Sequence, residues 1–344
     1  MAAIVWNGLD LARSTLPPEV DSELRSTAFK DTRQIFKLIA EAASIQAIFK
    51  TAGLEMMVVK GPPLSLQAFG AISMRQCRDI DILVKPADIM KARKLLLAAG
   101  YRQNFPENIH DEKELQFWLD LKKDLAFDCP SGTLLELHSR LQRNPHLFDE
   151  EALEHQTVRL APKVAVEALS GDDLLVYLCL HGGTHHWERM KWLADVAALL
   201  ENDPTRLERL CEYAQTGRAK VAVGLALLLC NRVFETNVPP RTILALRRSW
   251  RLRILSRYAL ARMIDRQIIA EKPFGSTQIQ LLALLLRFDA RYFFHELMHW
   301  LVDWSTVAAL GGKRHAVVMS VMLRPFTWGW TAISRLKRKI TRSP

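Results

Sequence analysis

The order of apolar and polar residues in the first third of the chain predicts alternating helices and strands. Apolar side chains recur at helical spacing through residues 22–52, and Gly53 is placed to end that helix. The pattern then predicts a strand, a short helix, a second strand and a further helix, at residues 55–60, 64–69, 78–84 and 86–99. A strand starting at Tyr101 and a helix with a loop over residues 106–124 follow. This succession is typical of a small α/β domain.

A Pro-Ser-Gly turn at residues 130–132 separates two short segments of alternating pattern, 125–129 and 133–138. Such a pair predicts a β-hairpin. Because strand side chains alternate between faces, Glu136 and His138 share one face of the second strand, opposite its leucines. That polar face either lines a site or is an ordinary half-exposed surface.

The second half of the chain has a different pattern. Residues 145–162 are less periodic, and we place a domain boundary there. From about Val166 the pattern is helical throughout, with helices predicted near residues 174–181, 186–201, 205–216, 218–233, 239–270, 277–301, 303–311 and 315–340. We therefore predict an α/β fold: a small mixed sheet with flanking helices in residues 1–150, then an all-α domain with a basic tail in residues 160–344.

Two aspartates on the predicted strand 78–84 carry the first chemical signal. Asp79 and Asp81 point the same way, while the apolar residues between them point into a core. Neighbouring carboxylates repel each other unless a cation lies between them, and hard divalent cations such as Mg²⁺ prefer oxygen ligands. Upstream, Gly61 follows the predicted strand 55–60 at a point where backbone can approach a phosphate closely, and Lys60 lies beside it. The alternative is an exposed strand edge with a solvated lysine.

Composition limits the classes of protein without choosing a function. The chain has 344 residues, enough for two domains, and a formal net charge of +10, which suits polyanionic partners: nucleoside triphosphates, nucleic acid or an anionic membrane surface. Its five cysteines are an odd number without a Cys-x-x-Cys pair, which excludes a zinc ribbon and a dithiol redox site. With no recognisable signal peptide or membrane-spanning segment, we expect reduced thiols and a cytoplasmic protein.

Several segments, taken in chain order, resemble one bacterial family. They are residues 60–61, 75, 78–84, 100–101, 135–138 and 192–196. Together they are similar to the bacterial uncharacterised nucleotidyltransferase family, within the polymerase-beta-like nucleotidyltransferase superfamily, over about residues 35–200. The resemblance implies Mg²⁺-dependent transfer of a nucleoside monophosphate from a nucleoside triphosphate, ATP among them. The acceptor could be a sugar, a polysaccharide precursor, a small metabolite, a protein side chain or RNA.

The resemblance also implies which acids form the site. Asp79 and Asp81 correspond to the two strand aspartates that hold two Mg²⁺ ions in the superfamily. Glu136 is the best match for the third carboxylate, which lies on a later strand of the same sheet, and Asp128 is the second choice. The proposed chemistry therefore requires Glu136 to lie beside the aspartates.

The phosphate-binding turn departs from the superfamily, which usually has Gly-Ser there. Lys60 and Gly61 are instead followed by two prolines, a version that resembles the abortive-infection and toxin-type enzymes. Lys60 and Arg75 would then contact the triphosphate, and His181 would lie in the interdomain cleft near the base or the acceptor. Two alternatives stay open: a toxin-like enzyme that modifies RNA, such as a tRNA end, and a non-catalytic nucleotide-binding protein that kept the fold.

Other polar groups have simpler structural interpretations. His181, His185 and His186 have no carboxylate at zinc-protease spacing, and we expect the Gly-Gly pair between them to break the helix. Asp195 lies in a mostly apolar helix, where we expect it to form a structural salt bridge or a helix cap. The alternative is that Asp195 is a cleft residue that contacts the nucleotide or the acceptor. A later acidic and histidine group is expected to be core or rim: His295, Glu296, His299 and Asp303. The aromatic and basic C-terminal tail is interpreted as a solvated helix end, with peripheral membrane contact as the less favoured alternative.

Overall fold

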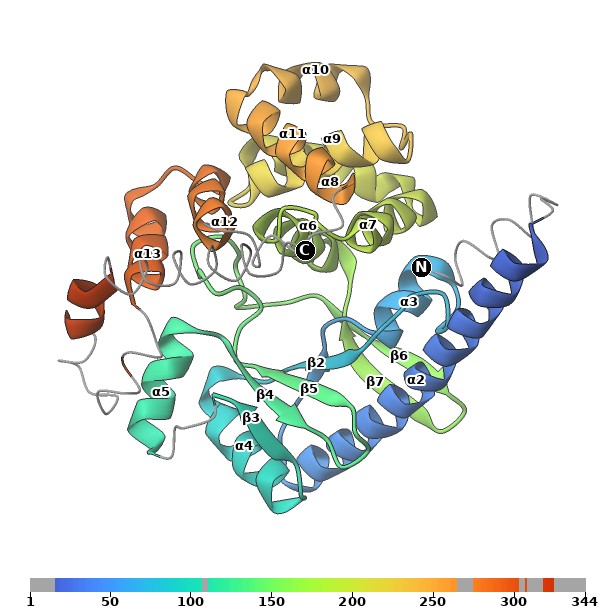
Figure 1. Ribbon diagram of the computed structural model, residues 1–344, viewed down its shortest axis with the longest axis vertical. Coiled ribbons are helices and arrows are strands. Elements are labelled where there is room, and N and C mark those ends of the chain that lie inside the picture. The colour runs from blue at the N-terminus through green and yellow to red at the C-terminus, as the bar shows by residue number, and fades with distance from the viewer. Residues whose placement is uncertain (1–15, 107–110, 265–274, 303–306, 308–317, 325–344) are drawn as a thin grey trace, which may run out of the picture.

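A mixed β-sheet forms the centre of the protein (Figure 1). The computed structural model describes residues 16–106, 111–264, 275–302, 307 and 318–324. In these residues seven strands pair in the order β3-β4-β5-β2-β1-β7-β6. They span Met57–Val58 (β1), Asp79–Leu83 (β2), Arg102–Phe105 (β3), Asp124–Asp128 (β4), Leu134–His138 (β5), His155–Ala161 (β6) and Val164–Leu169 (β7). The pairs β2–β5 and β1–β7 are parallel and the other neighbours are antiparallel, which confirms the predicted mixed sheet.

One face of the sheet is covered by helices from the first part of the chain. The long helix α2 (Pro18–Thr51) lies there with α4 (Ile89–Ala98), which follows the 3-10 turn η1 (Pro86–Asp88). The buried apolar stripe of α2 matches the predicted periodicity: Ile35, Leu38, Ile39, Ala42, Ile45 and Phe49. It packs in one core with the apolar positions of β2 and β5. Since strand side chains alternate, the polar positions of β2 and β5 point to the opposite face.

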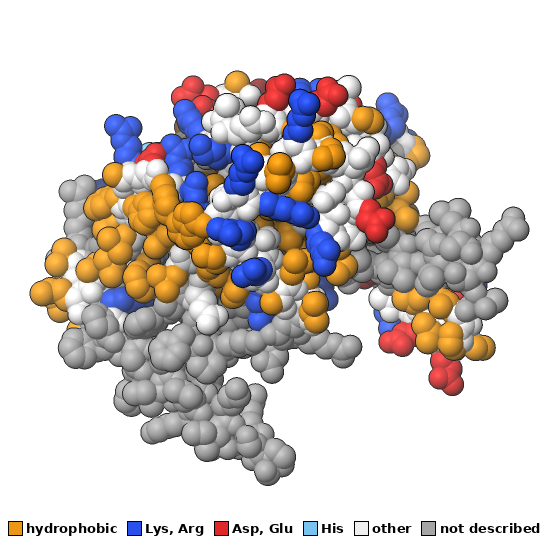
Figure 2. Space-filling model, turned by 90° about the horizontal axis from the view of Figure 1, so that it is seen from above, with side chains coloured by type: hydrophobic (Ala, Val, Ile, Leu, Met, Phe, Trp, Pro, Cys, Tyr) orange, Lys and Arg blue, Asp and Glu red, His pale blue; other side chains and the backbone are white. Residues whose placement is uncertain are grey.

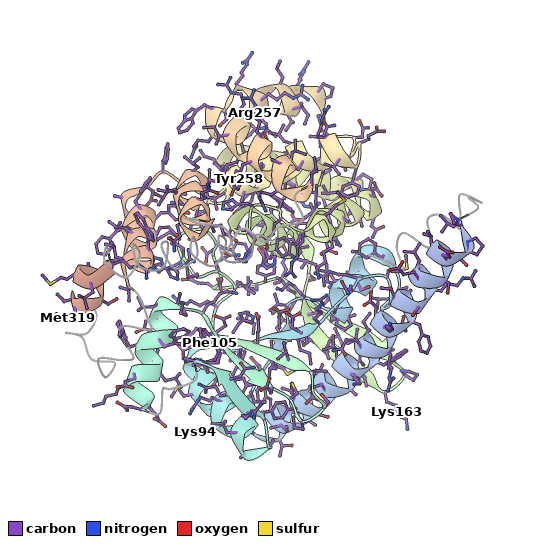
Figure 3. All side chains as sticks on the ribbon, in the orientation of Figure 1. Lys94, Phe105, Lys163, Arg257, Tyr258 and Met319 are labelled. Carbon is purple, nitrogen blue, oxygen red and sulfur yellow. The ribbon has the colours of Figure 1, made fainter. Side chains whose placement is uncertain are left out.

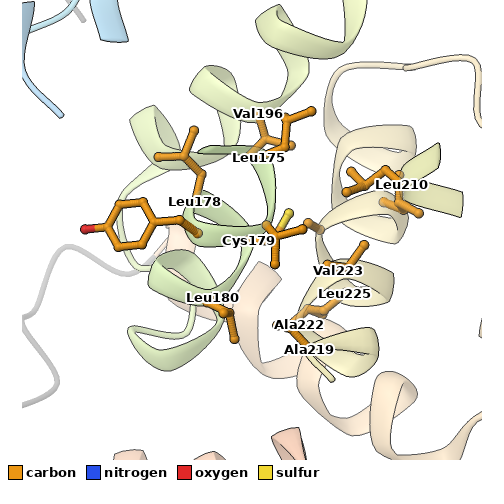
Figure 4. Close-up of a cluster of buried hydrophobic side chains, with 14 of the residues drawn as sticks. Leu175, Leu178, Cys179, Leu180, Val196, Leu210, Ala219, Ala222, Val223 and Leu225 are labelled. Carbon is orange, nitrogen blue, oxygen red and sulfur yellow. The ribbon is translucent and has the colours of Figure 1, made fainter. Parts of the chain in front are cut away.

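Helices from the second part of the chain cover that opposite face, with α3 (Pro62–Phe69) beside them (Figure 1). The buried residues of α5 (Glu112–Leu121) instead pack in the same core as α2. The helices of the second part are α6 (Gly171–Thr184), α7 (Met190–Asn202), α8 (Pro204–Thr216), α9 (Lys220–Val233), α10 (Pro240–Arg248), α11 (Trp250–Ile264), α12 (Gly275–Ala283), the 3-10 turn η3 (Leu284–Leu286) and α13 (Ala290–Leu301). Residues 318–324 are also helical. Figure 4 shows the apolar core in which α6 meets α7, α8 and α9. The predicted helical region is therefore confirmed.

The hairpin of β6 and β7 was missed by the sequence pattern. We interpreted residues 145–162 as a boundary and the chain from Val166 as helical, but β7 pairs in parallel with β1, with Val58 opposite Ala168. The recurrence of apolar residues at every second position, Val164, Val166 and Ala168, was the available signal. On the edge strand β6 most side chains are exposed, so its apolar pattern is weak. The sheet thus continues to Leu169, and the division into domains at residues 150–160 stays a prediction.

Two predicted long helices are interrupted. The helix predicted over residues 239–270 is divided at Ser249, which has extended backbone, into α10 and α11. The helix predicted over residues 277–301 is divided at Arg287, also extended, and α13 restarts where the Asp289 carboxylate accepts hydrogen bonds from the Arg291 and Tyr292 amides. The apolar periodicity of the sequence can continue through such a break, because the helices before and after it both bury an apolar face. The sequence pattern therefore does not reveal the interruption.

The predicted break at the glycine pair is wrong, because α6 continues through Gly182 and Gly183 to Thr184. Close packing explains these glycines. A Cβ atom at Gly182 would lie 2.4 Å from the buried ring of Trp187, whereas one at Gly183 would lie 3.3 Å from the Ala222 Cβ atom. Only the first glycine is therefore required by its neighbour.

Replacing Gly182 by alanine should lower the free energy of unfolding by about 1–3 kcal/mol, because the Trp187 ring must move. Gly183→Ala is the matched control. Its new Cβ atom makes only a mild contact with Ala222, and the higher helix propensity of alanine, worth about 1 kcal/mol relative to glycine, offsets the cost of that contact. Urea denaturation followed by circular dichroism measures both changes. Equal losses of stability in the two variants would contradict this account of Gly182.

None of the described helices is long and apolar enough to cross a membrane. All five cysteines are buried and free.

Candidate functional site

The acidic residues predicted from the sequence converge on one face of the sheet. Asp79 and Asp81 lie on β2, and Glu136 lies on the parallel neighbour β5, directly opposite Asp81 in the register. A carboxylate oxygen of Asp81, a carboxylate oxygen of Glu136 and a ring nitrogen of His138 lie within 4.8 Å of one another. The requirement that Glu136 lie beside the aspartates is therefore met.

Asp81 is the most enclosed of these acids, with 2% of its surface exposed. Its Oδ1 atom lies 3.0 Å from Lys60 Nζ and 3.3 Å from His138 Nε2. Burial opposes ionisation of Asp81, but the charge of Lys60 and the hydrogen bond from His138 hold its pKa well below the usual range. In the same way burial disfavours the ammonium of Lys60, yet the charge of Asp81 raises its pKa. The pair is thus an ionised, buried salt bridge.

Asp79 has the opposite electrostatic environment. Burial and the neighbouring charge of Asp81 raise the pKa of Asp79. A further cation near both carboxylates would relieve this repulsion. Oxygen ligands on adjacent strands suit a hard divalent ion, so Asp79, Asp81 and Glu136 together have the chemistry of a divalent-metal site.

His138 faces the same acids, but its hydrogen bonds indicate a supporting role. Its Nδ1 atom lies 3.2 Å from Lys123 Nζ. An ammonium group can only donate, so Nδ1 accepts and the ring hydrogen is assigned to Nε2, which points at Asp81 and at Glu136, 3.4 Å away. In this tautomer His138 orients the two carboxylates and offers no lone pair to a metal ion.

A cavity of about 600 Å³ lies over the acidic residues. Its wall combines the sheet face with α6, α7, α12, α13 and the segments next to β4 and β5. Many cationic side chains line it: Lys60, Arg75, Lys122, Lys123, Arg143, Arg189 and Lys191. A second cavity, of about 830 Å³, contains none of the predicted site residues. The smaller cavity is therefore the candidate functional site, with paired acids surrounded by cations that suit a polyanion.

Arg75 lines this cavity, as expected of a phosphate contact, but its guanidinium is already engaged. Its Nε atom lies 2.9 Å from both carboxylate oxygens of Asp195 on α7, and Nη1 lies 3.4 Å from Cys77 Sγ. Both charged side chains are buried, at 5% and 1% exposure. Asp195 thus forms a salt bridge, in agreement with the structural interpretation, whereas contact between Arg75 and phosphate stays a prediction.

The backbone conformation at position 61 explains why a glycine occurs there. Gly61 is the N-cap of α3 with φ of 79°, a left-handed conformation that favours glycine. Pro62 and Pro63 follow at the first helical positions and have no N–H group, so this helix end offers few amides to an anion. Gly61 is not among the residues that line the cavity, and Lys60 is. Positive charge in this part of the cavity therefore comes from side chains such as that of Lys60.

His181 lies in the cavity wall on α6, while its predicted place near the base or the acceptor stays a prediction. Its ring centroid is 4.8 Å from those of His185 and Trp192, and the Arg189 guanidinium lies 5.5 Å from the Trp192 ring centroid. Burial and the charge of Lys60 lower the pKa of His181, so its ring is neutral near pH 7. His181 and His185 share a surface because α6 continues through the glycine pair, which the sequence interpretation did not anticipate.

His186 takes no part in this surface. It is 1% exposed, and its Nε2 atom lies 3.1 Å from the Ile279 carbonyl oxygen on α12. Burial lowers the pKa of His186 from 6.5 to about 4. The structural interpretation of this histidine is thus consistent with its contacts.

We expect the buried His186 to make the protein less stable in acid. Between pH 6.5 and about 4 the unfolded chain binds a proton at this residue and the folded chain does not, so stability falls as the pH falls. The full loss is about 3 kcal/mol. Urea denaturation across this range should show a shallower pH dependence for His186→Asn, and asparagine tolerates the positive φ at this position. The exposed His155→Asn is the control, and an unchanged pH slope in His186→Asn would contradict the assignment.

The remaining predicted groups are Glu296 and His299 on α13, the alternative third carboxylate Asp128, and Asp303. Glu296 on α13 accepts hydrogen bonds from Arg143 at 2.6 Å and Asn144 at 2.9 Å, so it joins α13 to the segment after β5. His299 Nε2 lies 2.7 Å from Lys122 Nζ. Asp128 accepts hydrogen bonds from side chains of β3 and lies outside the cavity that Glu136 lines, while the role of Glu136 as the third carboxylate stays a prediction. Asp303 and the C-terminal tail lie outside the described residues.

Comparison with known proteins agrees with this geometry. A family model described as "Uncharacterised nucleotidyltransferase" matches residues 1–235, which include every strand of the sheet and the helices α6 to α9. No curated protein matches the sequence.

Proposed function

Because the chain belongs to the uncharacterised nucleotidyltransferase family, we propose that it transfers a nucleoside monophosphate from a nucleoside triphosphate to an acceptor hydroxyl. Divalent ions held by Asp79, Asp81 and Glu136 would assist the transfer. The observation that carries this proposal is the pairing of Asp81 with Glu136 across parallel strands, inside a cavity lined by cations. A volume of about 600 Å³ is within the range of small-molecule sites.

The reaction requires one bond to form and one to break. The acceptor oxygen bonds to the α-phosphorus, the bond to the bridging oxygen breaks, and pyrophosphate leaves with that electron pair. The acceptor proton passes to a nearby base, a role that we propose for Glu136. Positioning and neutralisation of phosphate charge supply most of the rate enhancement in such displacements. When bound, divalent ions such as Mg²⁺ would neutralise charge and lower the pKa of the acceptor hydroxyl.

Lys60 has two successive partners in this proposal. Without a metal ion, its ammonium neutralises Asp81 at 3.0 Å. With a divalent ion held at Asp81, the Lys60 ammonium would be available to contact the departing pyrophosphate as a point charge. Arg189 and Lys191, which also line the cavity, would supply further positive charge, and Lys191 donates a 3.3 Å hydrogen bond to the Gln76 carbonyl oxygen.

His138 and Lys123 would act as positioning residues. Lys123 contacts His138, which in turn contacts Asp81 and Glu136. These contacts would keep the distance between the two carboxylates fixed in the absence of a ligand. Such preorganisation reduces the reorganisation needed in the transition state.

The proposal is tested by supplying each nucleoside triphosphate labelled at the α-phosphate, with fractionated cell extract as acceptor. We expect pyrophosphate release together with label in one fraction, and loss of both when a chelator removes divalent metal. Label in total RNA would identify the RNA-modifying form of the activity. Calorimetry with each nucleotide, with and without Mg²⁺, accompanies the assay, and a protein that binds no nucleotide in either condition contradicts the proposal.

A further inference from the structure

The outer helices of the helical region form a strongly basic surface. Together α10 and α11 contain seven arginines and no acidic residue. Five of them are exposed and form no ion pair within the described part of the chain: Arg241, Arg247, Arg248, Arg253 and Arg257. Figure 2 looks down on this side of the molecule and shows Lys and Arg side chains lying beside a broad apolar area.

Aromatic residues connect these arginines to the apolar area. Trp250 on α11, Phe288 in the segment before α13 and Phe293 on α13 follow one another with ring centroids 6.1 and 5.8 Å apart. They are 48%, 54% and 36% exposed. The Arg251 guanidinium lies 4.6 Å from the Phe288 ring centroid, so the basic and apolar parts form one continuous surface.

The apolar area continues over α12 and α13. Leu281, Phe294 and Leu297 are 50%, 66% and 44% exposed, and they border a shallow apolar pocket of about 150 Å³. On α10 and α11 the exposed Leu244 and Ile254 lie among the arginines. Large exposed apolar areas on a folded protein mark a surface that another molecule covers.

We propose that this arginine-aromatic face, formed by α10, α11, α12 and α13, binds the surface of an anionic lipid membrane. Exposed Phe, Trp, Leu and Ile side chains can enter the boundary between headgroups and acyl chains, while neighbouring arginines contact lipid phosphates. The shallow pocket between Phe294 and Leu297 has the apolar lining that an acyl chain requires. The interaction places the protein on the membrane surface and requires no spanning segment.

The same features argue against two other partners. In a symmetric dimer through this face, the arginines of one copy would lie against those of the other, with no acid on α10 or α11 to neutralise them. RNA would pair with the arginines and stack on aromatic rings, but it offers no partner to exposed Leu281, Leu297 and Ile254. An anionic membrane satisfies both the charge and the aliphatic side chains.

Sedimentation of the full-length protein with lipid vesicles tests the proposal. Wild type should bind vesicles of phosphatidylcholine mixed with phosphatidylglycerol much more tightly than pure phosphatidylcholine, and added salt should weaken the binding. Arg247→Gln, Arg248→Gln and Arg253→Gln combined should reduce the partition coefficient roughly a hundredfold, at about fivefold for each arginine. Phe294→Ser with Leu297→Ser should reduce it by at least about tenfold. All five side chains are exposed, so circular dichroism should be unchanged.

The matched control is Arg159→Gln with Lys163→Gln, two exposed cations on the β6–β7 hairpin. Figure 3 shows Lys163 at the opposite end of the molecule from Arg257. This control should bind vesicles as wild type does, and so should Asp81→Asn, because the inference is independent of the transfer reaction. Equal binding to both kinds of vesicle, or a control that loses as much binding as the arginine variant, would overturn the proposal. If vesicles are not bound, two other results would also overturn the proposal. One is tight binding of single-stranded RNA. The other is dimerisation in sedimentation velocity that the combined variant Phe294→Ser with Leu297→Ser abolishes.

Discussion

Asp81→Asn should lower nucleotidyl transfer by about a thousandfold or more while leaving the protein folded. Asp81 is the carboxylate at which the site converges: it faces Glu136 in the register, Lys60 at 3.0 Å and His138 at 3.3 Å. Asparagine keeps an oxygen of similar position, which can still accept from Lys60 and His138, but it removes the charge that a divalent ion requires. Losing one preorganised electrostatic contact commonly costs a factor of about 10² to 10³ in rate, and loss of a metal ligand removes more.

Pyrophosphate release under single-turnover conditions measures this loss, and calorimetric titration with Mg²⁺ or Mn²⁺ should show weaker metal binding in the same variant. The metal titration separates a defect at the acids from a defect in acceptor binding. Asp128→Asn is the matched control, since Asp128 lies on the same face of the sheet but outside the cavity, paired with Arg102. Turnover near the wild-type rate in Asp81→Asn would remove Asp81 from the mechanism.

Asp195→Ala should lower the free energy of unfolding by about 3–5 kcal/mol, the largest stability change that we expect for a single substitution in this protein. Both members of the Arg75–Asp195 pair are almost fully buried, and their side chains are 2.9 Å apart. Removing the carboxylate leaves the guanidinium of Arg75 without its partner in a region with little water. An uncompensated buried charge costs far more than the pair contributes when intact.

Urea denaturation measures the loss, and the double variant Arg75→Met with Asp195→Leu should recover most of it, because both charges are then absent. Asp172→Ala is the control, since its partner Arg209 forms an exposed pair of 2.6 Å, and exposed pairs contribute less than about 1 kcal/mol. Similar losses in Asp195→Ala and Asp172→Ala would show that burial does not decide the strength of the Arg75 pair.

The double variant also addresses the role of Arg75 in the site. If Arg75 contacts phosphate in addition to Asp195, the stable double variant should bind nucleoside triphosphate more weakly than wild type. If Arg75 only connects α7 to the sheet, nucleotide affinity should be preserved once stability is restored. The measurement is calorimetric titration with a nucleoside triphosphate and Mg²⁺.

Local patterns were sufficient to predict the elements that position the acids. Alternation along residues 78–84 and 133–138 placed Asp79, Asp81, Glu136 and His138 on polar strand faces, and the structure has them there. The pattern failed for β6, an edge strand whose exposed side chains give little alternation, and for β7, whose short run merged with the helix that follows. It also failed at Gly182, where a glycine required by the ring of Trp187 resembled a helix break.

The sequence by itself therefore determined which residues are acidic, which face of each strand they occupy and which helices have an apolar stripe, because these depend on periodicity along a few neighbouring residues. Only the tertiary structure decided that β5 lies beside β2, that Lys60 neutralises Asp81, and that Arg75 is engaged by a carboxylate 120 positions further along the chain. Such contacts depend on how distant segments pack and on which charges are buried together, and no local pattern records either. The same reason explains the arginine-aromatic face, whose two parts are separate in the sequence and become continuous only where α11 contacts Phe288, in the segment before α13.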